Sequence, residues 1–109
     1  MSFLKQKNCS ACKSTDKPFT ESEISKYKPL LHPDWKVIDL HHIERSFKFK
    51  DFKEALDFVN KIGFIAEAEG HHPDLSLSWG KVGVILFTHK IKGLSLNDFI
   101  LAAKIDALS

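Results

Sequence analysis

The chain has 109 residues, a formal net charge of +2, 43% hydrophobic residues and 28% charged residues. This length suits one domain, and the composition is that of a folded globular protein rather than a disordered one. The near-neutral charge argues against a nucleic-acid partner, and no apolar run approaches the roughly 18 residues of a membrane span. The first nine residues also lack the apolar segment of a secretory signal, so we expect a cytoplasmic protein with no membrane partner.

Residues 1–19 show little hydrophobic periodicity and predict an irregular N-terminal arm in front of a domain over residues 20–109. The only two cysteines, Cys9 and Cys12, form a C-x-x-C pair in this arm. One pair supplies two of the four ligands of a structural zinc site, and no strand precedes Cys9 as a redox motif requires. We expect reduced thiols, while metal binding stays open because the chain also holds six histidines.

The first regular element is a helix. The segment Thr20-Glu21-Ser22-Glu23 matches a capping box, in which Thr and Glu side chains each accept a hydrogen bond from a free backbone N–H. The helix is expected from Glu21 to about Leu31, because the following His32-Pro33 disfavours helical backbone.

Two strands are predicted next, over Trp35–Leu40 and Ile43–Phe49. In the second, apolar and polar residues alternate, which indicates a half-buried strand. Arg45 is the exception, because it falls on the apolar side. His41-His42, which lies between the strands, is interpreted as an exposed turn.

A long helix follows from Asp51, its N-cap, to about Glu69, with apolar residues at helical spacing on one side. Gly70 stands where a helix C-terminus favours left-handed backbone. Strands over Leu75–Trp79 and Val82–Thr88 come next, joined by a two-residue turn at Gly80-Lys81 with Gly at its first position.

The last element is a helix from Ser95 to about Leu108, with Asp98 three residues into a second cap-like arrangement. The element order is α-β-β-α-β-β-α. Hairpin strands separated by helices predict an α+β fold, with a single four-stranded antiparallel sheet and the helices packed on one of its faces.

Three histidines are placed to converge. His71-His72-Pro73 lies between the long helix and the third strand, and His89 ends the fourth strand. Because the third and fourth strands pair across a hairpin, the start of one lies beside the end of the other. Glu67 stands about one helical turn before His71 and is expected at the same end of the sheet.

Pro73 pushes His72 towards extended backbone, in which adjacent side chains point to opposite sides, so His71 and His72 should serve different purposes. Imidazole exchanges protons near neutral pH, which suits acid/base catalysis. Three histidines could instead bind zinc with an open fourth position, or simply be solvated at strand ends. The residues alone leave these three alternatives open.

These residues resemble the signature of the pterin-4a-carbinolamine dehydratase family. The resemblance covers roughly residues 20–109, and its core spans about 32 residues with all spacings kept. The matching segments are Glu67 to Pro73, Trp79-Gly80-Lys81-Val82, Thr88-His89, Gly93-Leu94-Ser95 with Asp98, Trp35-Lys36-Val37, and Phe47 to Phe52.

The resemblance implies the α+β fold expected above and a homodimer or homotetramer. The implied reaction is loss of water from 4a-hydroxytetrahydrobiopterin, or a related carbinolamine, to give quinonoid dihydropterin. The pterin is a substrate, and no cofactor or metal is implied. The product is reduced again to serve aromatic amino acid hydroxylases, which implies a functional link to phenylalanine hydroxylase.

By position, His71, His72 and His89 match the three active-site histidines of the family. We favour His72 and His89 for proton transfer, with His71 orienting the substrate. The residues expected to bind or frame the pterin are Glu67, which could also hold a histidine tautomer, Trp35, which could pack on the ring, Pro73, Thr88, and Asp98, which could fix the loop of His89 or merely cap a helix.

Two departures concern the rim of the site: Gly70 stands where many relatives have an acidic residue, and Leu75 where many have an aromatic one. Some animal members also bind a homeodomain transcription factor, so an interaction module is a competing function; the helix over residues 51–69 could supply its apolar face. A third hypothesis is that the protein is a metal-dependent hydrolase, although no carboxylate or cysteine completes a metal-ligand set near His71.

Overall fold

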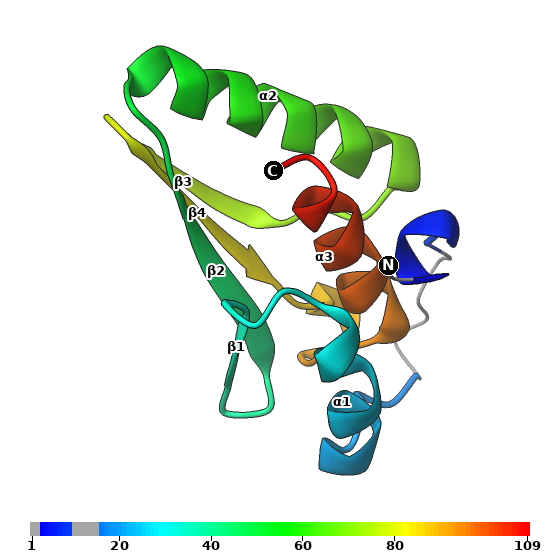
Figure 1. Ribbon diagram of the computed structural model, residues 1–109. Helices are drawn as coiled ribbons and strands as arrows, with labels where there is room; N and C mark the ends of the chain where they lie inside the picture. The colour runs from blue at the N-terminus through cyan, green and yellow to red at the C-terminus, as the bar shows by residue number, and fades with distance from the viewer. Residues whose placement is uncertain (1–2, 10–15) are drawn as a thin grey trace.

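The computed structural model describes residues 3–9 and 16–109 and shows one sheet with the helices on one of its faces (Figure 1). The predicted α+β class is therefore confirmed. All strand pairs are antiparallel, in the order β1-β2-β4-β3. The elements are η1 (Phe3–Gln6), α1 (Glu21–Tyr27), η2 (Lys28–Leu30), β1 (Lys36–Ile38), β2 (His42–Lys48), α2 (Phe52–Glu69), β3 (Asp74–Ser78), β4 (Lys81–Leu86), η3 (His89–Ile91) and α3 (Leu96–Asp106).

The hydrophobic core lies between the sheet and the helices. Alternate residues of β2 and β4 point into it, as their period of two requires. The buried side chains of these two strands are Ile43, Phe47, Val82, Val84 and Leu86. Of the helices, α3 is the most deeply buried, and its N-terminal half is almost wholly inaccessible to solvent. The N-terminal end of α3 is thus held rigidly.

Arg45 lies on the core side of β2 because it has a partner there. Its Nη1 atom lies 2.6 Å from Oδ1 of Asp106, and its guanidinium carbon lies 4.1 Å from the centre of the Phe47 ring. The indole Nε1–H of Trp35 donates to the same carboxylate oxygen at 2.8 Å. A buried charge is tolerated when it is paired and hydrogen-bonded, which explains the break in the apolar pattern.

The predicted N-caps of α1 and α2 and the C-terminal Gly70 of α2 are confirmed, whereas α1 ends at Tyr27 rather than near Leu31, with the 3-10 turn η2 following it. Thr20 and Glu23 form the capping box of α1. The Asp51 side chain accepts a hydrogen bond from the backbone N–H of Glu54 at 2.9 Å, and Gly70 closes α2 in the left-handed conformation at φ +66°. The direction in which the chain leaves α2 is therefore set by Gly70.

The predicted turn at Gly80-Lys81 is wrong by one residue. Ser78 pairs with Lys81 in the sheet, so the turn consists of Trp79 and Gly80. The φ angle of Gly80 is not positive; the glycine with a positive φ is Gly70. A Cβ atom at Gly80 would instead lie 2.8 Å from the carbonyl oxygen of Phe49, so Gly80 serves a close backbone approach.

The N-terminal arm contacts the domain. Leu4 is fully buried in the core, and the Cys9 backbone N–H donates to the Glu69 carboxylate at 2.7 Å. Cys12 lies outside the described residues. Within residues 3–9 and 16–109, no helix combines the length and apolar character needed to cross a membrane.

Candidate active site

His71 is held by a buried carboxylate. Gly70 turns the chain so that the His71 Nε2 atom lies 2.6 Å from Oδ1 of Asp98, which is fully buried in the first turn of α3. An ionised carboxylate only accepts hydrogen bonds, so Nε2 carries the proton of this bond. In the neutral ring, Nδ1 is then the unprotonated nitrogen and is available as an acceptor.

The second carboxylate oxygen of Asp98 joins two more segments. It accepts from the Thr88 hydroxyl at 2.9 Å and from the Ser95 backbone N–H at 2.9 Å, while the Thr88 and Ser95 hydroxyl oxygens lie 2.8 Å apart. Asp98 therefore caps α3 and also fixes the segment after β4. The two roles considered for Asp98 from the sequence are both observed.

His72 has a different partner from His71. Its Nε2 atom contacts Oε2 of Glu67 on the last turn of α2. Both side chains are exposed, at 59% for His72 and 80% for Glu67, whereas His71 is 12% exposed. Pro73 follows, half-buried, immediately before β3.

His89 opens η3 rather than ending a strand, because β4 ends at Leu86. Its exposed ring lies tilted against the ring of Phe87, with 4.1 Å between ring centres and 32° between ring planes. Thr88, which precedes it, is tied to Asp98. Asp98 thus connects His71 to Thr88, the residue before His89, while His72 follows His71 in the chain and contacts Glu67 at the end of α2.

Trp35 is not brought to the histidines. Its side chain is 1% exposed and bonds Asp106 at the last turn of α3. At 1.5 Å per residue, Asp106 lies about 12 Å along the helix axis from Asp98. Contact between Trp35 and a pterin stays a prediction.

Comparisons with known proteins agree with this arrangement. Residues 17–108 match the family model described as pterin 4 alpha carbinolamine dehydratase. The chain belongs to this family. A relative from Alkaliphilus metalliredigens, provisionally named a pterin-4-alpha-carbinolamine dehydratase, is 57% identical over 97% of this chain and 96% of its own length. A relative of the same name from Rubrobacter xylanophilus is 47% identical over 99% of this chain and all of its own length.

A solved structure from Brucella melitensis, described as a transcriptional coactivator/pterin dehydratase, superposes with a TM-score of 0.78 at 35% identity, covering 84% of this chain and 98% of its own. The resemblance found in the sequence is confirmed. The family match contains every predicted site residue from Trp35 to Asp98, whereas Cys9 lies before it.

Cys9 contributes no reactive thiolate to this pterin dehydratase-family site. Burial, followed by the nearby Glu69 carboxylate, raises the pKa of the thiol to about 12. The Cys9 Sγ–H points to the Asn97 carbonyl at 3.6 Å. In the part of the chain that the structure describes, no three His, Cys, Asp or Glu residues are grouped as metal ligands.

The sequence interpretation missed His41, His42 and Phe87. His41 and His42 were expected in an exposed turn, but both are half-buried, and their Nδ1 atoms lie 3.0 Å apart. The His41 ring lies 4.7 Å from the ring of Phe87, which in turn contacts His89. The pairing of Ile43 with Leu86 brings these segments together, and that register is not visible in the sequence.

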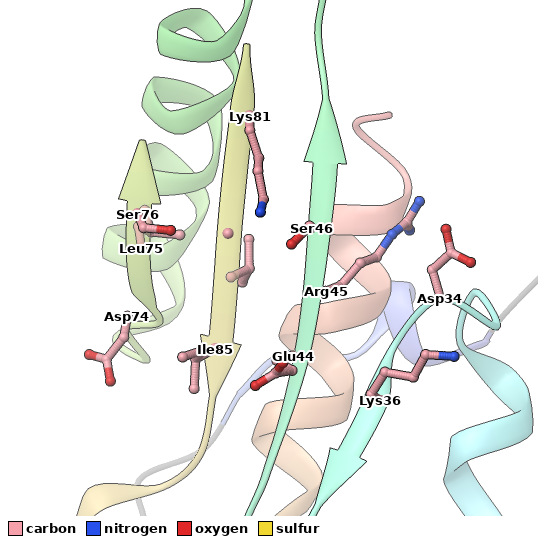
Figure 2. A pocket seen from close by; sticks show the side chains of 12 residues that line it. Asp34, Lys36, Glu44, Arg45, Ser46, Asp74, Leu75, Ser76, Lys81 and Ile85 are labelled. Atoms are coloured by element: carbon pink, nitrogen blue, oxygen red, sulfur yellow. The ribbon is translucent and has the colours of Figure 1, made fainter. Parts of the chain in front are cut away.

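A separate hollow of about 530 Å³ lies on the face of the sheet opposite the helices (Figure 2). Polar and charged side chains of all four strands line it, among them Lys36, Glu44, Ser76 and Lys81. None of its lining residues is a histidine. The hollow therefore does not include the candidate catalytic residues of this family member.

Proposed function

We propose that the protein is a 4a-hydroxytetrahydrobiopterin dehydratase, which removes water from the carbinolamine to give quinonoid dihydropterin. The observation that supports this most strongly is the joining of His71 to the segment of His89 through the fully buried carboxylate of Asp98, beside a solvent-accessible His72. Site-bearing segments from α2, β4 and α3 meet at this point.

The reaction requires two proton transfers. An acid protonates the 4a-hydroxyl as the carbon–oxygen bond breaks, and a base removes a ring N–H proton, whose electron pair forms the new carbon–nitrogen double bond. Water leaves with the proton of the acid, so atoms and charge balance. We assign the transfers to His72 and His89, which are exposed, and the orientation of the substrate to His71 through its Nδ1 acceptor.

Neither transfer needs a metal, because imidazole and imidazolium are both populated near neutral pH. We further propose that the enzyme acts in the cytoplasm as a homodimer or homotetramer. There it would recycle the pterin cofactor of an aromatic amino acid hydroxylase such as phenylalanine hydroxylase.

The test is a coupled phenylalanine hydroxylase assay in which decay of the 4a-carbinolamine is followed with and without the purified protein. The wild type is expected to accelerate the decay equally in the presence and absence of a chelator. His72→Ala and His89→Ala are expected to lower the rate about 10²-fold or more, the usual contribution of a general acid or base. A folded wild type without effect on the decay would exclude the proposal.

A second candidate, a protein-interaction module, is favoured by one observation. The helix α2 exposes Phe64 at 79%, Phe52 at 45% and Leu56 at 38%, an apolar surface unusual for one helix. The similar Brucella protein is also described as a coactivator. Binding of a fluorescent amphipathic helical peptide, lost in Phe64→Asp, would support this role, and an unchanged anisotropy would count against it.

A further inference from the structure

The candidate acid/base residue His89 is held differently from the other two histidines. His71 and His72 each contact a carboxylate. Among residues 3–9 and 16–109, no hydrogen-bond partner of the His89 ring is found, and its ring contact is with Phe87, at 4.1 Å between ring centres and tilted by 32°. The direction of the His89 ring therefore depends on an apolar neighbour.

Phe87 is itself held from the β1–β2 hairpin. The His41 ring lies 4.7 Å from Phe87 at 40°, and the His42 ring lies 6.4 Å away. The two Nδ1 atoms of His41 and His42 share one hydrogen bond of 3.0 Å, and the His42 Nε2 atom lies 3.5 Å from Oε1 of Glu44. A continuous set of contacts thus runs from Glu44 in β2 to His89.

The turn that presents His41 is strained. Asp39 and Leu40 both have left-handed backbone, at φ 53° and 57°. Two such residues in succession make a tight hairpin turn, which normally uses Asn or Gly. For Leu40 this conformation is unfavourable, because its Cβ atom comes close to the following carbonyl oxygen. The His41 N–H donates to the Ile38 carbonyl at 2.9 Å and closes the turn.

We propose that Phe87 is a positioning residue for His89, and that His41 keeps Phe87 in place, so that the β1–β2 hairpin supports the active site. This inference rests on the proposed dehydratase function. Phe87 confines the His89 imidazole to one orientation against its ring. Without this contact, the imidazole can choose among three χ1 wells and two χ2 orientations, so the productive one would be populated about one sixth of the time.

The kinetic test compares Phe87→Leu with Phe49→Leu. Both replace a half-buried phenyl ring by an apolar side chain, but the Phe49 ring contacts Phe58, tilted by 45°, near the other end of β2. Phe87→Leu is expected to lower kcat about 3- to 10-fold with KM changed less than about twofold. Phe87→Tyr, which keeps the ring, should restore kcat, and His41→Ala should lower it about twofold. Phe49→Leu should leave both constants unchanged.

A double variant separates positioning from a structural role. If Phe87 acts through His89, the Phe87→Leu change lowers activity no further once His89→Ala is present. An equal loss in both backgrounds, or an unchanged kcat in Phe87→Leu, would overturn the inference.

An NMR measurement tests the contact between His89 and Phe87 independently of enzyme activity. Because the two ring centres are only 4.1 Å apart, the ring current of Phe87 should shift His89 ring protons in the NMR spectrum of histidine-labelled protein. The shift should be lost in Phe87→Leu and reduced in His41→Ala. Ordinary His89 shifts in the wild type would exclude the contact, whereas an inactive wild type with shifted His89 signals would exclude the dehydratase proposal alone.

Discussion

The Nε2 atom of His71 lies 2.6 Å from Oδ1 of Asp98, a carboxylate with no solvent exposure. The other oxygen of Asp98 accepts from Thr88 and from the backbone of Ser95. One side chain thereby connects the end of α2, the end of β4 and the start of α3. The orientation of His71 and the capping of α3 depend on the same two oxygen atoms.

Asp98→Asn should weaken both functions of this carboxylate. The amide keeps the shape of the side chain, but its NH₂ group must face at least one of the three donors. A buried donor without an acceptor costs about 1–3 kcal/mol, and we expect the free energy of unfolding to fall by that amount in urea titration. Because His71 also loses its fixed tautomer, the dehydratase rate should fall at least tenfold.

The matched control is Asp57→Asn on the exposed surface of α2. Asp57 pairs with Lys53 four residues earlier at 3.1 Å, and such exposed pairs contribute only about 0.3–0.5 kcal/mol. An equal loss of stability in the two variants would contradict the role assigned to Asp98.

Gly70→Ala tests the backbone that aims His71. A Cβ atom at Gly70 would meet no heavy atom within 4 Å, so the expected penalty comes from the left-handed φ of +66° alone. We expect the free energy of unfolding to fall by about 1 kcal/mol, and less for Gly70→Asn, which tolerates this conformation.

Gly63 provides the opposite case within the same helix. A Cβ atom there also meets nothing, but Gly63 lies inside α2. Gly63→Ala should therefore stabilise the fold by about 0.5–1 kcal/mol. If Gly63→Ala and Gly70→Ala changed the free energy of unfolding in the same direction, in thermal or urea unfolding, this account of Gly70 would be refuted.

The Arg45–Asp106 pair should show strong coupling. Asp106→Ala leaves Arg45 and the Trp35 indole N–H without their acceptor, and removing one partner of a buried pair costs about 3 kcal/mol or more. Arg45→Met should cost less, because Asp106 keeps its other donors. The double variant should be more stable than the sum of the two losses implies, and additive losses in a double-mutant cycle would argue against a coupled pair.

Cys9 should react slowly with thiol reagents. Since burial and Glu69 raise the pKa of its thiol from 9.0 to about 12, the thiolate at pH 8 is on the order of 10³-fold scarcer than in the unfolded chain. In a Cys12→Ser background, labelling of the folded protein by iodoacetamide should be at least tenfold slower than labelling in denaturant.

The raised pKa of Cys9 also makes the free energy of unfolding depend on pH. The unfolded chain loses the Cys9 proton first as pH rises, so this group lowers the free energy of unfolding between about pH 9 and pH 12. Comparison of the wild type with Cys9→Ala over this interval gives the effect directly. Equal pH dependence in the two proteins would show that the thiol remains accessible.

Local rules predicted much of the fold. The capping box at Thr20, the N-cap at Asp51 and the C-terminal Gly70 each act within a few residues of their own position, so the sequence locates them closely. The predicted hairpin turn is wrong by one residue because a glycine is favoured at the first turn position, whereas Gly80 is the second residue of the actual turn. The actual constraint is the carbonyl of Phe49, which is distant in sequence.

The parts of the site formed by residues close in sequence were predictable, whereas the contacts that depend on strand pairing in the sheet were not. His71, His72 and Glu67 lie within six residues of the chain, and the two histidines contact different carboxylates. The contact of His41 with Phe87 spans 46 positions and depends on the register between β2 and β4. Arg45 likewise breaks the apolar pattern of its strand because of a partner, Asp106, that lies 61 residues away in the sequence.

The double duty of Asp98 bears on how this chain can change over time. Catalytic groups often weaken a fold, so that their replacement raises stability and offers a trade against activity. Replacement of Asp98 cannot raise stability at the cost of activity in this way, because its carboxylate supports the start of α3 as well as His71. A duplicated copy freed from any demand for catalysis would still be selected to keep this aspartate, so its presence in a distant descendant is evidence of folding and not by itself of a working enzyme.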